Sequence, residues 1–309
     1  MNVAVLSGGV GGARFLRGLV GVVDPGNVAI VGNVADDIEV LGLRVSPDLD
    51  SILYTLAGVS DEERGWGRAG ETWQALESVA QLGGESWFKL GDRDIGLHLV
   101  RTELLRNGVT LTEATERIAR AFGLAARLLP ATDDPVRTFL ETPDGTFPFQ
   151  TWFVARGHRD EVDALHYAGA PDASAAPGVL EAIDEADVIL IAPSNPYVSI
   201  GPILAVTEIR AALERRSVPC VAISPLIGGR AVKGPADRML SRLAGGTTPA
   251  HVASCYEGLI DVLVIDELDE ADGPVPGLKQ TVITKTLMSD ESAARKLAAA
   301  AVHSAGALA

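Results

Sequence analysis

The sequence has few cysteines, little positive charge and no long apolar stretch. Only two cysteines, Cys220 and Cys255, occur among its 309 residues, and neither belongs to a Cys-x-x-Cys pair. We therefore interpret both as reduced thiols of a cytoplasmic protein without a disulfide framework. No run reaches the roughly 18 apolar residues of a membrane span, and the first residues lack the pattern of a secretion signal.

The shortage of positive charge limits the partners that the protein can have. Its 26 Lys and Arg residues face 41 Asp and Glu residues, which gives a formal net charge of −15. Because nucleic acids and anionic membranes are bound through clustered Lys and Arg, the charge argues against both partners. If the substrate is a small anion, a few local cationic side chains or a metal ion must supply the missing positive charge.

Several catalytic motifs are absent as well. There is no His-x-x-x-His pair and no Gly-x-Ser-x-Gly elbow, so a hydrolase with a covalent nucleophile is unsupported. His98 lies on a predicted helix among apolar residues, and we interpret it as structural. The glycine-rich stretch 8–12 is followed by Arg14 at the place of the third glycine in the dinucleotide fingerprint, and no Gly-Lys-Ser/Thr follows it. An NAD-dependent oxidoreductase or a Walker-type nucleotide site is therefore weakly supported.

Short apolar runs, each followed by a helical pattern, recur at both ends of the chain. Buried strands are predicted at 2–7, 28–31, 187–192, 218–223 and 261–265. Hydrophobic residues make up 47% of the chain, enough for a sizeable core. The alternation predicts an α/β fold, a doubly wound, Rossmann-like and mostly parallel sheet, in a single domain that spans residues 1–309.

The middle of the chain interrupts this alternation. We expect an inserted α+β elaboration at about 92–175, in which two antiparallel strands, 137–140 and 149–155, surround a turn at 143–145. The stretch 128–134 reads as a turn. Longer helices are predicted at 95–106 and 203–215, with Asp92 as a plausible N-cap of the first.

Four loops follow predicted strands and should meet at one edge of the sheet, where such folds bind ligands. They cover residues 7–14, 32–37, 193–199 and 224–234. Each loop alone has ordinary turn composition, but their convergence predicts a phosphate or nucleotide site. The candidate contacts are Gly8, Gly9, Gly11, Gly12, Arg14, Asn33, Ser194, Asn195, Ser199, Arg230 and Lys233. Asn195 is also a common turn former, and Arg14 in a first helical turn is disfavoured by the helix dipole.

Acidic residues cluster before and after a predicted helix start. Asp36 and Asp37 precede it, and Asp48 and Asp50 follow Pro47, which favours a first helical turn. Capping explains Asp48 but leaves Asp50 without a reason. The four carboxylates could gather a hard divalent cation such as Mg²⁺, and the alternative is that they are solvated loop acids.

Lys89 stands in an apolar environment between Phe88 and Leu90, directly before Gly91. A lysine in such a run usually extends its ammonium group to solvent. The alternative is that Lys89 points into a cleft and neutralises a ligand there.

Five separated motifs resemble the family of 2-phospho-L-lactate transferases of coenzyme F-420 biosynthesis. They are Ser7-Gly-Gly-Val-Gly-Gly-Ala-Arg14, Ser46-Pro-Asp48-Leu-Asp50, Leu90-Gly-Asp-Arg-Asp94, Ala192-Pro-Ser-Asn-Pro196 and Ser224-Pro-Leu-Ile-Gly228. The bacterial branch is most similar, on the motifs Arg64-Gly-Trp-Gly67, Glu71-Thr-Trp73 and Ala126-Arg-Leu-Leu-Pro-Ala-Thr-Asp133. One departure is Ala35, where members of the family usually carry glycine.

The resemblance implies a Mg²⁺-dependent transferase that is a homodimer. It would move a phospholactate or phosphoenolpyruvate moiety from a guanosine diphosphate-type donor to FO, a deazaflavin alcohol. The products would be F-420-0 or dehydro-F-420-0 and GMP. Asp50 and Lys89 match the positions that contact FO in the family, and we expect Asp50, with Asp48 beside it, to act on the acceptor hydroxyl. The alternative is a non-catalytic, sugar-nucleotide-binding regulatory protein of a related family.

Overall fold

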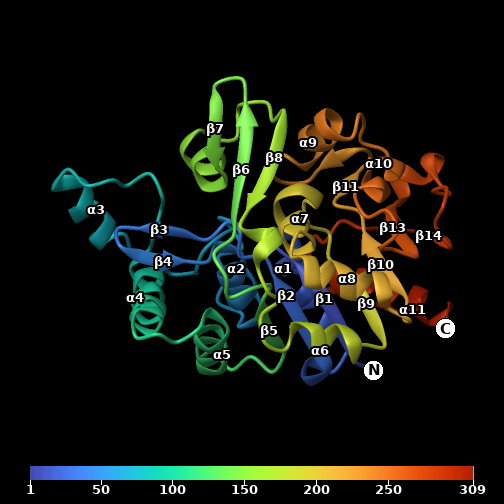
Figure 1. Ribbon diagram of the computed structural model, residues 1–309, viewed down its shortest axis with the longest axis horizontal. Helices are drawn as coiled ribbons and strands as arrows, with labels where there is room; N and C mark the ends of the chain where they lie inside the picture. The colour runs from blue at the N-terminus through green and yellow to red at the C-terminus, as the bar shows by residue number, and fades with distance from the viewer. Residues whose placement is uncertain (309) are drawn as a thin grey trace.

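The computed structural model describes residues 1–308 and is built on a seven-stranded central sheet (Figure 1). Every pair of neighbouring strands in this sheet is parallel, in the order β14-β13-β10-β9-β1-β2-β5. The strands are β1 (Val3–Ser7), β2 (Val28–Gly32), β5 (Arg127–Pro130), β9 (Val188–Ile191), β10 (Cys220–Ile223), β13 (Val262–Asp266) and β14 (Gln280–Thr284). The Rossmann-like, mostly parallel fold predicted from the alternating pattern is confirmed.

Helices cover both faces of the central sheet, because successive strand side chains point to opposite sides. Val3 and Val5 of β1 belong to a core with α1 (Gly9–Leu19), α2 (Pro47–Leu56) and α11 (Glu291–Gly306). Ala4 and Leu6 belong to the core on the other face. The helices on that face are α6 (Val179–Asp184), α7 (Gly201–Leu204), α8 (Thr207–Arg215) and α10 (Pro249–Ser254). Strands buried on both sides explain why their sequences are continuous apolar runs.

The order of the strands defines one switch point in the sheet. From β1 the chain moves outward to β2 and β5, whereas from β9 it moves the other way to β10, β13 and β14. The loops after β1 and β9 therefore diverge, although their first residues touch. Ser194 Oγ donates a 2.7 Å hydrogen bond to the carbonyl oxygen of Gly8. This is the place where doubly wound sheets bind ligands.

Smaller elements surround the switch point. A hairpin of β3 (Ile38–Val40) and β4 (Leu43–Val45) lies beside α3 (Gln74–Gln81) and α4 (Asp92–Arg106), and α5 (Leu111–Ala121) follows α4 (Figure 1). A separate antiparallel sheet, in the order β7-β6-β8, projects from the top of the central sheet in the same view. Its strands are β6 (Arg137–Thr142), β7 (Gly145–Pro148) and β8 (Ala164–Ala168). The helix α9 (Ala236–Leu243) places Leu240 in the core beside the central sheet and Met239 in an apolar cluster with Trp152.

Two local predictions in the middle of the chain are wrong, whereas the strand 137–140 and the turn after it are confirmed by β6 and its pairing with β7. The predicted turn at 128–134 begins with β5, an edge strand where Pro130 removes no needed hydrogen bond. The predicted strand 149–155 is wrong, since β7 ends at Pro148 and Thr151–Ala155 form a π-helical turn. Phe149, Trp152 and Phe153 recur at helical spacing and pack in one apolar cluster, which favours the turn.

Two other helix predictions need correction, and an edge strand of the central sheet was missed. The predicted helix 203–215 divides into α7 and α8, because Val206 is extended between them. The sequence also predicts a helix at 71–82, and in the structure this helix, α3, begins at Gln74. The strand β14, at the edge beside β13, was not expected from the sequence.

Residues of the motifs around Glu71 and Asp92 cap two neighbouring helices reciprocally. Glu71 accepts hydrogen bonds from the backbone N–H groups of Arg93 (2.8 Å) and Asp94 (3.0 Å) at the start of α4. Asp92, which was expected to cap its own helix, lies inside α4 and accepts from Gln74 N and Ala75 N at the start of α3. A Cβ at Gly91 would lie 2.3 Å from the Glu71 side chain, so this contact requires glycine.

Within residues 1–308, no helix combines the length and the apolar character needed to cross a bilayer.

We predict opposite effects on stability for two glycine-to-alanine changes inside helices. A Cβ at Gly18 of α1 would lie 2.3 Å from the carbonyl oxygen of Ala294 in α11, so Gly18→Ala should lower the free energy of unfolding by about 1–3 kcal/mol. Gly96→Ala in α4 is the control, since no atom lies within 4 Å, and it should raise stability by up to about 1 kcal/mol. Urea titration measures both, and equal effects would contradict the close packing of α1 on α11.

Candidate functional site

A cavity of about 800 Å³ opens at the switch point, where the loops after β1 and β9 diverge. Its walls come from the starts of α1 and α2, from the loops after β9 and β10, from residues 149–158 and from residues 286–288. The convergence of loops expected from the sequence therefore produces one concave site, as parallel α/β sheets commonly do.

Most predicted site residues line this cavity. They are Gly8, Gly9, Gly11, Arg14, Asp36, Asp48, Asp50, Lys89, Ser194, Asn195, Ser199 and Lys233. Four predicted residues lie outside the lining: Gly12, Asn33, Asp37 and Arg230. The Arg230 side chain is 85% exposed and lies 4.0 Å from Asp237, so the structure gives it no contact with the site.

The glycine-rich stretch forms a tight turn rather than an extended loop. The helix α1 begins at Gly9, directly after the N-cap residue Gly8. A Cβ at Gly8 would lie 2.5 Å from Asp48 Oδ2 and 2.9 Å from Ser199 Cβ, so only glycine allows these elements to meet. Gly12 packs against Ser7 and Ser194 and serves packing. Arg14 is in the second turn of α1, beyond the first N–H groups, which have no partner in the helix and can bind an anion.

Asn33 holds Asp48 in place instead of lining the cavity. Its Nδ2 atom donates to Asp48 Oδ2 at 2.9 Å and to the carbonyl oxygen of Val198 at 3.2 Å. Its Oδ1 atom accepts from the backbone N–H of Ala35 at 2.9 Å. Because both ends of the amide are engaged within the protein, Asn33 is a positioning residue for Asp48.

Asp36 and Asp48 form a pair of buried acids in the cavity wall. Burial raises the pKa of Asp36 well above its usual range, and the neighbouring charges of Asp48 and Asp37 raise it further. Burial likewise raises the pKa of Asp48 to about 6, against the lowering effect of the hydrogen bond from Asn33. Asp36 Oδ1 is buried and has no hydrogen-bond partner. An oxygen-rich, repulsive and unsatisfied pair of this kind fits a hard divalent cation.

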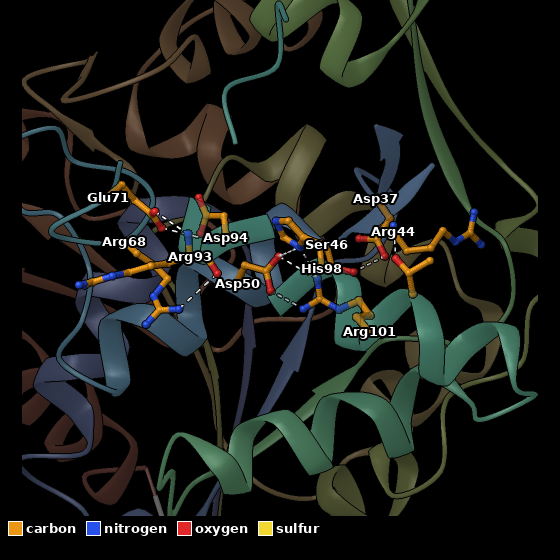
Figure 2. A network of polar contacts seen from close by, with 11 residues as sticks. Asp37, Arg44, Ser46, Asp50, Arg68, Glu71, Arg93, Asp94, His98 and Arg101 are labelled. Atoms are coloured by element: carbon orange, nitrogen blue, oxygen red, sulfur yellow. Dashed lines mark hydrogen bonds and ion pairs between the residues drawn. The ribbon is translucent and has the colours of Figure 1, made fainter. Parts of the chain in front are cut away.

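Asp37 and Asp50 point elsewhere, so the four acids do not meet at one point. Asp37 Oδ2 accepts a 2.7 Å hydrogen bond from Ser46, and burial raises the pKa of Asp37 to about 7. Figure 2 shows the Asp50 carboxylate facing Arg101 and His98, whereas the Asp37 carboxylate faces Ser46. Among residues 1–308, no three His, Cys, Asp or Glu side chains are arranged to hold a metal ion.

Asp50 forms a bidentate ion pair with Arg101. Arg101 Nη1 donates to Asp50 Oδ2 at 3.0 Å, and Nη2 donates to Oδ1. Asp50 is 5% exposed and Arg101 is 2% exposed, so the carboxylate is not the solvated turn residue that the sequence indicated. The pair connects α2 to α4 while Asp50 still contributes to the cavity wall.

Positive charge also reaches the cavity. Arg14, Arg64, Lys89 and Lys233 all line it, and their charges oppose those of the acidic wall. The Arg64 guanidinium lies 4.9 Å from the ring centres of both Trp66 and Trp73 and pairs with Asp61 at 2.8 Å. Lys89 is an exposed residue of the cavity lining. The local cations that an acidic chain needs for an anionic substrate are therefore present.

The sequence reading missed an aromatic wall and a histidine. Phe149, Phe153 and His158 line the cavity and stack in succession, with ring centres 5.1 Å and 4.9 Å apart. His98, interpreted as structural, lines the cavity next to Asp50. Burial lowers the pKa of His98 to about 4, against the opposing effect of Asp50, so the ring is neutral at pH 7. Helical spacing could have identified the phenylalanines, but no local pattern marks Arg101.

Comparisons with known proteins match nearly the whole chain. The sequence model of the family described as 2-phospho-L-lactate transferase CofD matches residues 3–304. The chain belongs to the 2-phospho-L-lactate transferase family. A phosphoenolpyruvate transferase from Streptomyces griseus is 46% identical over 87% of this chain and 86% of that protein. Another from Thermobifida fusca is 42% identical over 98% of this chain and 97% of that protein.

A solved structure shares the fold of this member of the 2-phospho-L-lactate transferase family. It is a protein of the UPF0052 family from Bacillus halodurans, with a TM-score of 0.63 and 19% sequence identity. The match covers 97% of this chain and 98% of the other. At this identity the likeness concerns the arrangement of the elements alone.

We predict that Gly8→Ala disables the site of this family member without unfolding it. Gly8 has φ −158°, which alanine adopts freely, so the added Cβ acts only by displacing Asp48 and Ser199. Displacements of about 1 Å at a reacting centre can cost about 100-fold in rate. Circular dichroism should show an intact fold while transferase turnover falls on that scale. Turnover within a few-fold of the unaltered protein would contradict the close approach of Asp48 to the β1–α1 turn.

Proposed function

We propose that the protein transfers a phosphoenolpyruvate or phospholactate moiety from a guanosine diphosphate-type donor to the deazaflavin FO in coenzyme F-420 biosynthesis. The family match supports a transferase, and the relatives named phosphoenolpyruvate transferase favour the enolpyruvyl donor. The observation that carries the proposal is a cavity at the switch point that is lined by both acidic and cationic side chains. The cationic side chains can bind the phosphates of a diphosphate-linked donor, and a carboxylate can accept a hydrogen bond from an alcohol acceptor.

The proposed reaction is a phosphoryl-type transfer. The acceptor hydroxyl oxygen forms a bond to the phosphorus that carries the three-carbon acid. The bond between this phosphorus and the bridging oxygen breaks, and GMP leaves with the electron pair. The hydroxyl proton passes from the acceptor to water. Because such reactions depend on positioning and charge neutralisation, they need no covalent nucleophile, in agreement with the absence of nucleophile motifs from the sequence.

We assign the proposed Mg²⁺ to Asp36 and Asp48. These two carboxylates share the cavity wall, repel each other and leave Asp36 Oδ1 without a partner. Mg²⁺ in proteins is commonly held by one or two carboxylates together with substrate phosphates and water, so a larger cluster of acids is unnecessary. The ion would offset charge on the diphosphate. Asp37 and Asp50, expected to share in this site, are engaged with Ser46 and Arg101 instead.

The acceptor is assigned to Asp50 and Lys89. Both oxygens of Asp50 accept hydrogen bonds from Arg101, and a carboxylate held in this way suits an anchor for a hydroxyl better than a base that must take its proton. Lys89 is an exposed residue of the same cavity lining. Asp48, the second acid proposed for the chemistry, acts on the donor side with the metal.

The donor is assigned to the start of α1 and to the loops after β9 and β10. The first N–H groups of α1, which have no partner within the helix, and the cations Arg14 and Lys233 suit phosphate oxygens. Ser194, Asn195 and Ser199 line the adjacent wall. The side-chain Oδ1 of Asn195 already accepts from Tyr197 N, so Asn195 shapes its loop as well as lining the site.

Product analysis tests the proposed function. Purified protein is incubated with FO and Mg²⁺ and with either the lactyl or the enolpyruvyl diphosphoguanosine donor, and products are identified by mass spectrometry. We expect dehydro-F-420-0 and GMP from the enolpyruvyl donor, loss of turnover on chelation and recovery with added Mg²⁺. No product with either donor, while FO and Mg²⁺ are present, would refute the proposal. Undiminished turnover after exhaustive chelation would refute the metal assignment.

Lys233 and Arg230 lie in the same loop, and replacing each in turn tests which of the two cations contacts the donor. Lys233 lines the cavity, whereas the Arg230 side chain is directed to solvent. Lys233→Ala should raise the KM for the donor by about tenfold, the scale of a lost hydrogen bond to a charged group, and leave the KM for FO unchanged. Arg230→Ala should change neither value. A larger effect from Arg230→Ala than from Lys233→Ala would place the donor outside this cavity.

A further inference from the structure

The guanidinium group of Arg101 contacts two cavity residues without reaching the cavity itself. Its Nη1 atom lies 3.0 Å from Asp50 Oδ2 and 3.3 Å from His98 Nδ1, and its Nη2 atom binds Asp50 Oδ1. Asp50 and His98 line the cavity, whereas Arg101, which contacts both of them (Figure 2), does not. One buried cation therefore sets the orientation of both side chains.

The contact with Arg101 also fixes the tautomer of His98. A guanidinium group has only hydrogen-bond donors, so His98 Nδ1 must be the acceptor. A neutral imidazole that accepts at Nδ1 carries its proton on Nε2. Among the described residues, no hydrogen bond engages Nε2. This N–H donor is therefore available on the cavity side of a ring whose other nitrogen is held from behind.

Asp50 and His98 consequently form a matched pair. His98 and Arg101 are three residues apart on α4, which places them on one helix face. Asp50 lies on α2, next to that face. His98 Nδ1 lies 3.8 Å from Asp50 Oδ2. The pair offers a charged acceptor beside a neutral donor. A hydroxyl group both donates and accepts, so it can satisfy the two residues together, whereas a carbonyl or a phosphate oxygen cannot.

We propose that Arg101 is a positioning residue that presents Asp50 and His98 jointly to a hydroxyl of the acceptor's side chain. This role rests on the proposed function, in which the acceptor is an alcohol. The role of Arg101 goes beyond the proposed function, because it assigns His98 as a second contact of the acceptor and Arg101 as the group that aligns Asp50 and His98.

Stability alone explains the arrangement poorly. A buried ion pair usually stabilises a fold no better than apolar residues of the same volume, because both charges lose their hydration. Arg101 Nε is, in addition, buried without a hydrogen-bond partner, so the guanidinium is incompletely satisfied. An arrangement that aligns two cavity residues gives a reason for keeping these charges inside the protein.

The test compares binding of FO with binding of a deazaflavin whose side chain lacks hydroxyl groups. Binding is followed by the fluorescence of the deazaflavin, so the measurement needs no turnover. The variants are Arg101→Lys, which keeps the charge but loses the planar fork, and His98→Phe, which removes the Nε2 donor. His98→Gln restores a neutral donor in a side chain of similar reach. Arg106→Lys, the same change at an exposed position of α4, is the control.

We expect unaltered protein and Arg106→Lys to prefer FO over the hydroxyl-free analogue. Arg101→Lys and His98→Phe should each weaken FO binding by about 10-fold or more, and His98→Gln should recover part of the loss. Affinity for the analogue and the KM for the donor should stay within about twofold, because neither compound uses the pair. His98→Phe and His98→Gln leave the ion pair intact, so they carry the test if Arg101→Lys does not fold.

Three other outcomes would contradict the proposed role of Arg101. Equal loss of affinity for FO and for the analogue, together with a lowered melting temperature, would mean that Arg101 is only structural. Unchanged preference for FO in both Arg101→Lys and His98→Phe would overturn the proposed role while the proposed function stands. If the unaltered protein binds no FO at all, the proposed function fails and the role of Arg101 fails with it.

Discussion

The ion pair between Asp50 and Arg101 connects the central sheet to the segment that covers one side of the cavity. Asp50 belongs to α2, which packs on the sheet, and Arg101 belongs to α4, which is joined to α3 by the reciprocal caps of Glu71 and Asp92. Removing one partner of such a buried pair typically costs about 3–5 kcal/mol, because the other charge is left unpaired. The same contact therefore determines how this segment sits and which way Asp50 faces.

Separation of charge is the second constraint on the site. Asp36 and Asp48 lie together at low exposure, and their pKa values are raised by burial. Arg14 and Lys233 lie at the same cavity. In a chain with a net charge of −15, this local arrangement can attract an anionic donor that the molecule as a whole repels. A divalent cation on the acidic pair would join the two kinds of charge around one diphosphate group.

The fold was largely predictable from the sequence, whereas the connections within the site were not. Buried parallel strands and the helices between them leave apolar patterns that can be read directly. Strand β5 was read as a turn because it is short and ends in Pro130. Which loops reach the cavity also followed from the alternating pattern, since the carboxyl ends of parallel strands share one edge.

Side-chain direction is what the sequence could not supply. Asp48 and Asp50 are two positions apart in α2, so they project to different sides of the helix, one toward Asn33 and the other toward Arg101. The expectation of four converging acids overlooked this geometry. Arg230 and Lys233 have the same charge in the same loop, yet only Lys233 lines the cavity. The link from Asp50 to Arg101 spans 51 residues and leaves no local pattern.

The central claim is that Asp36 and Asp48 hold the cation while Asp50 faces the acceptor. A crystal structure with FO, GMP and Mn²⁺ in place of Mg²⁺ tests it most directly, because Mn²⁺ gives an anomalous signal that marks its position. The account predicts an anomalous peak at the carboxylates of Asp36 and Asp48, and a side-chain hydroxyl of FO within hydrogen-bonding distance of Asp50. A peak at Asp37 or Asp50, or FO bound away from Asp50, would contradict it.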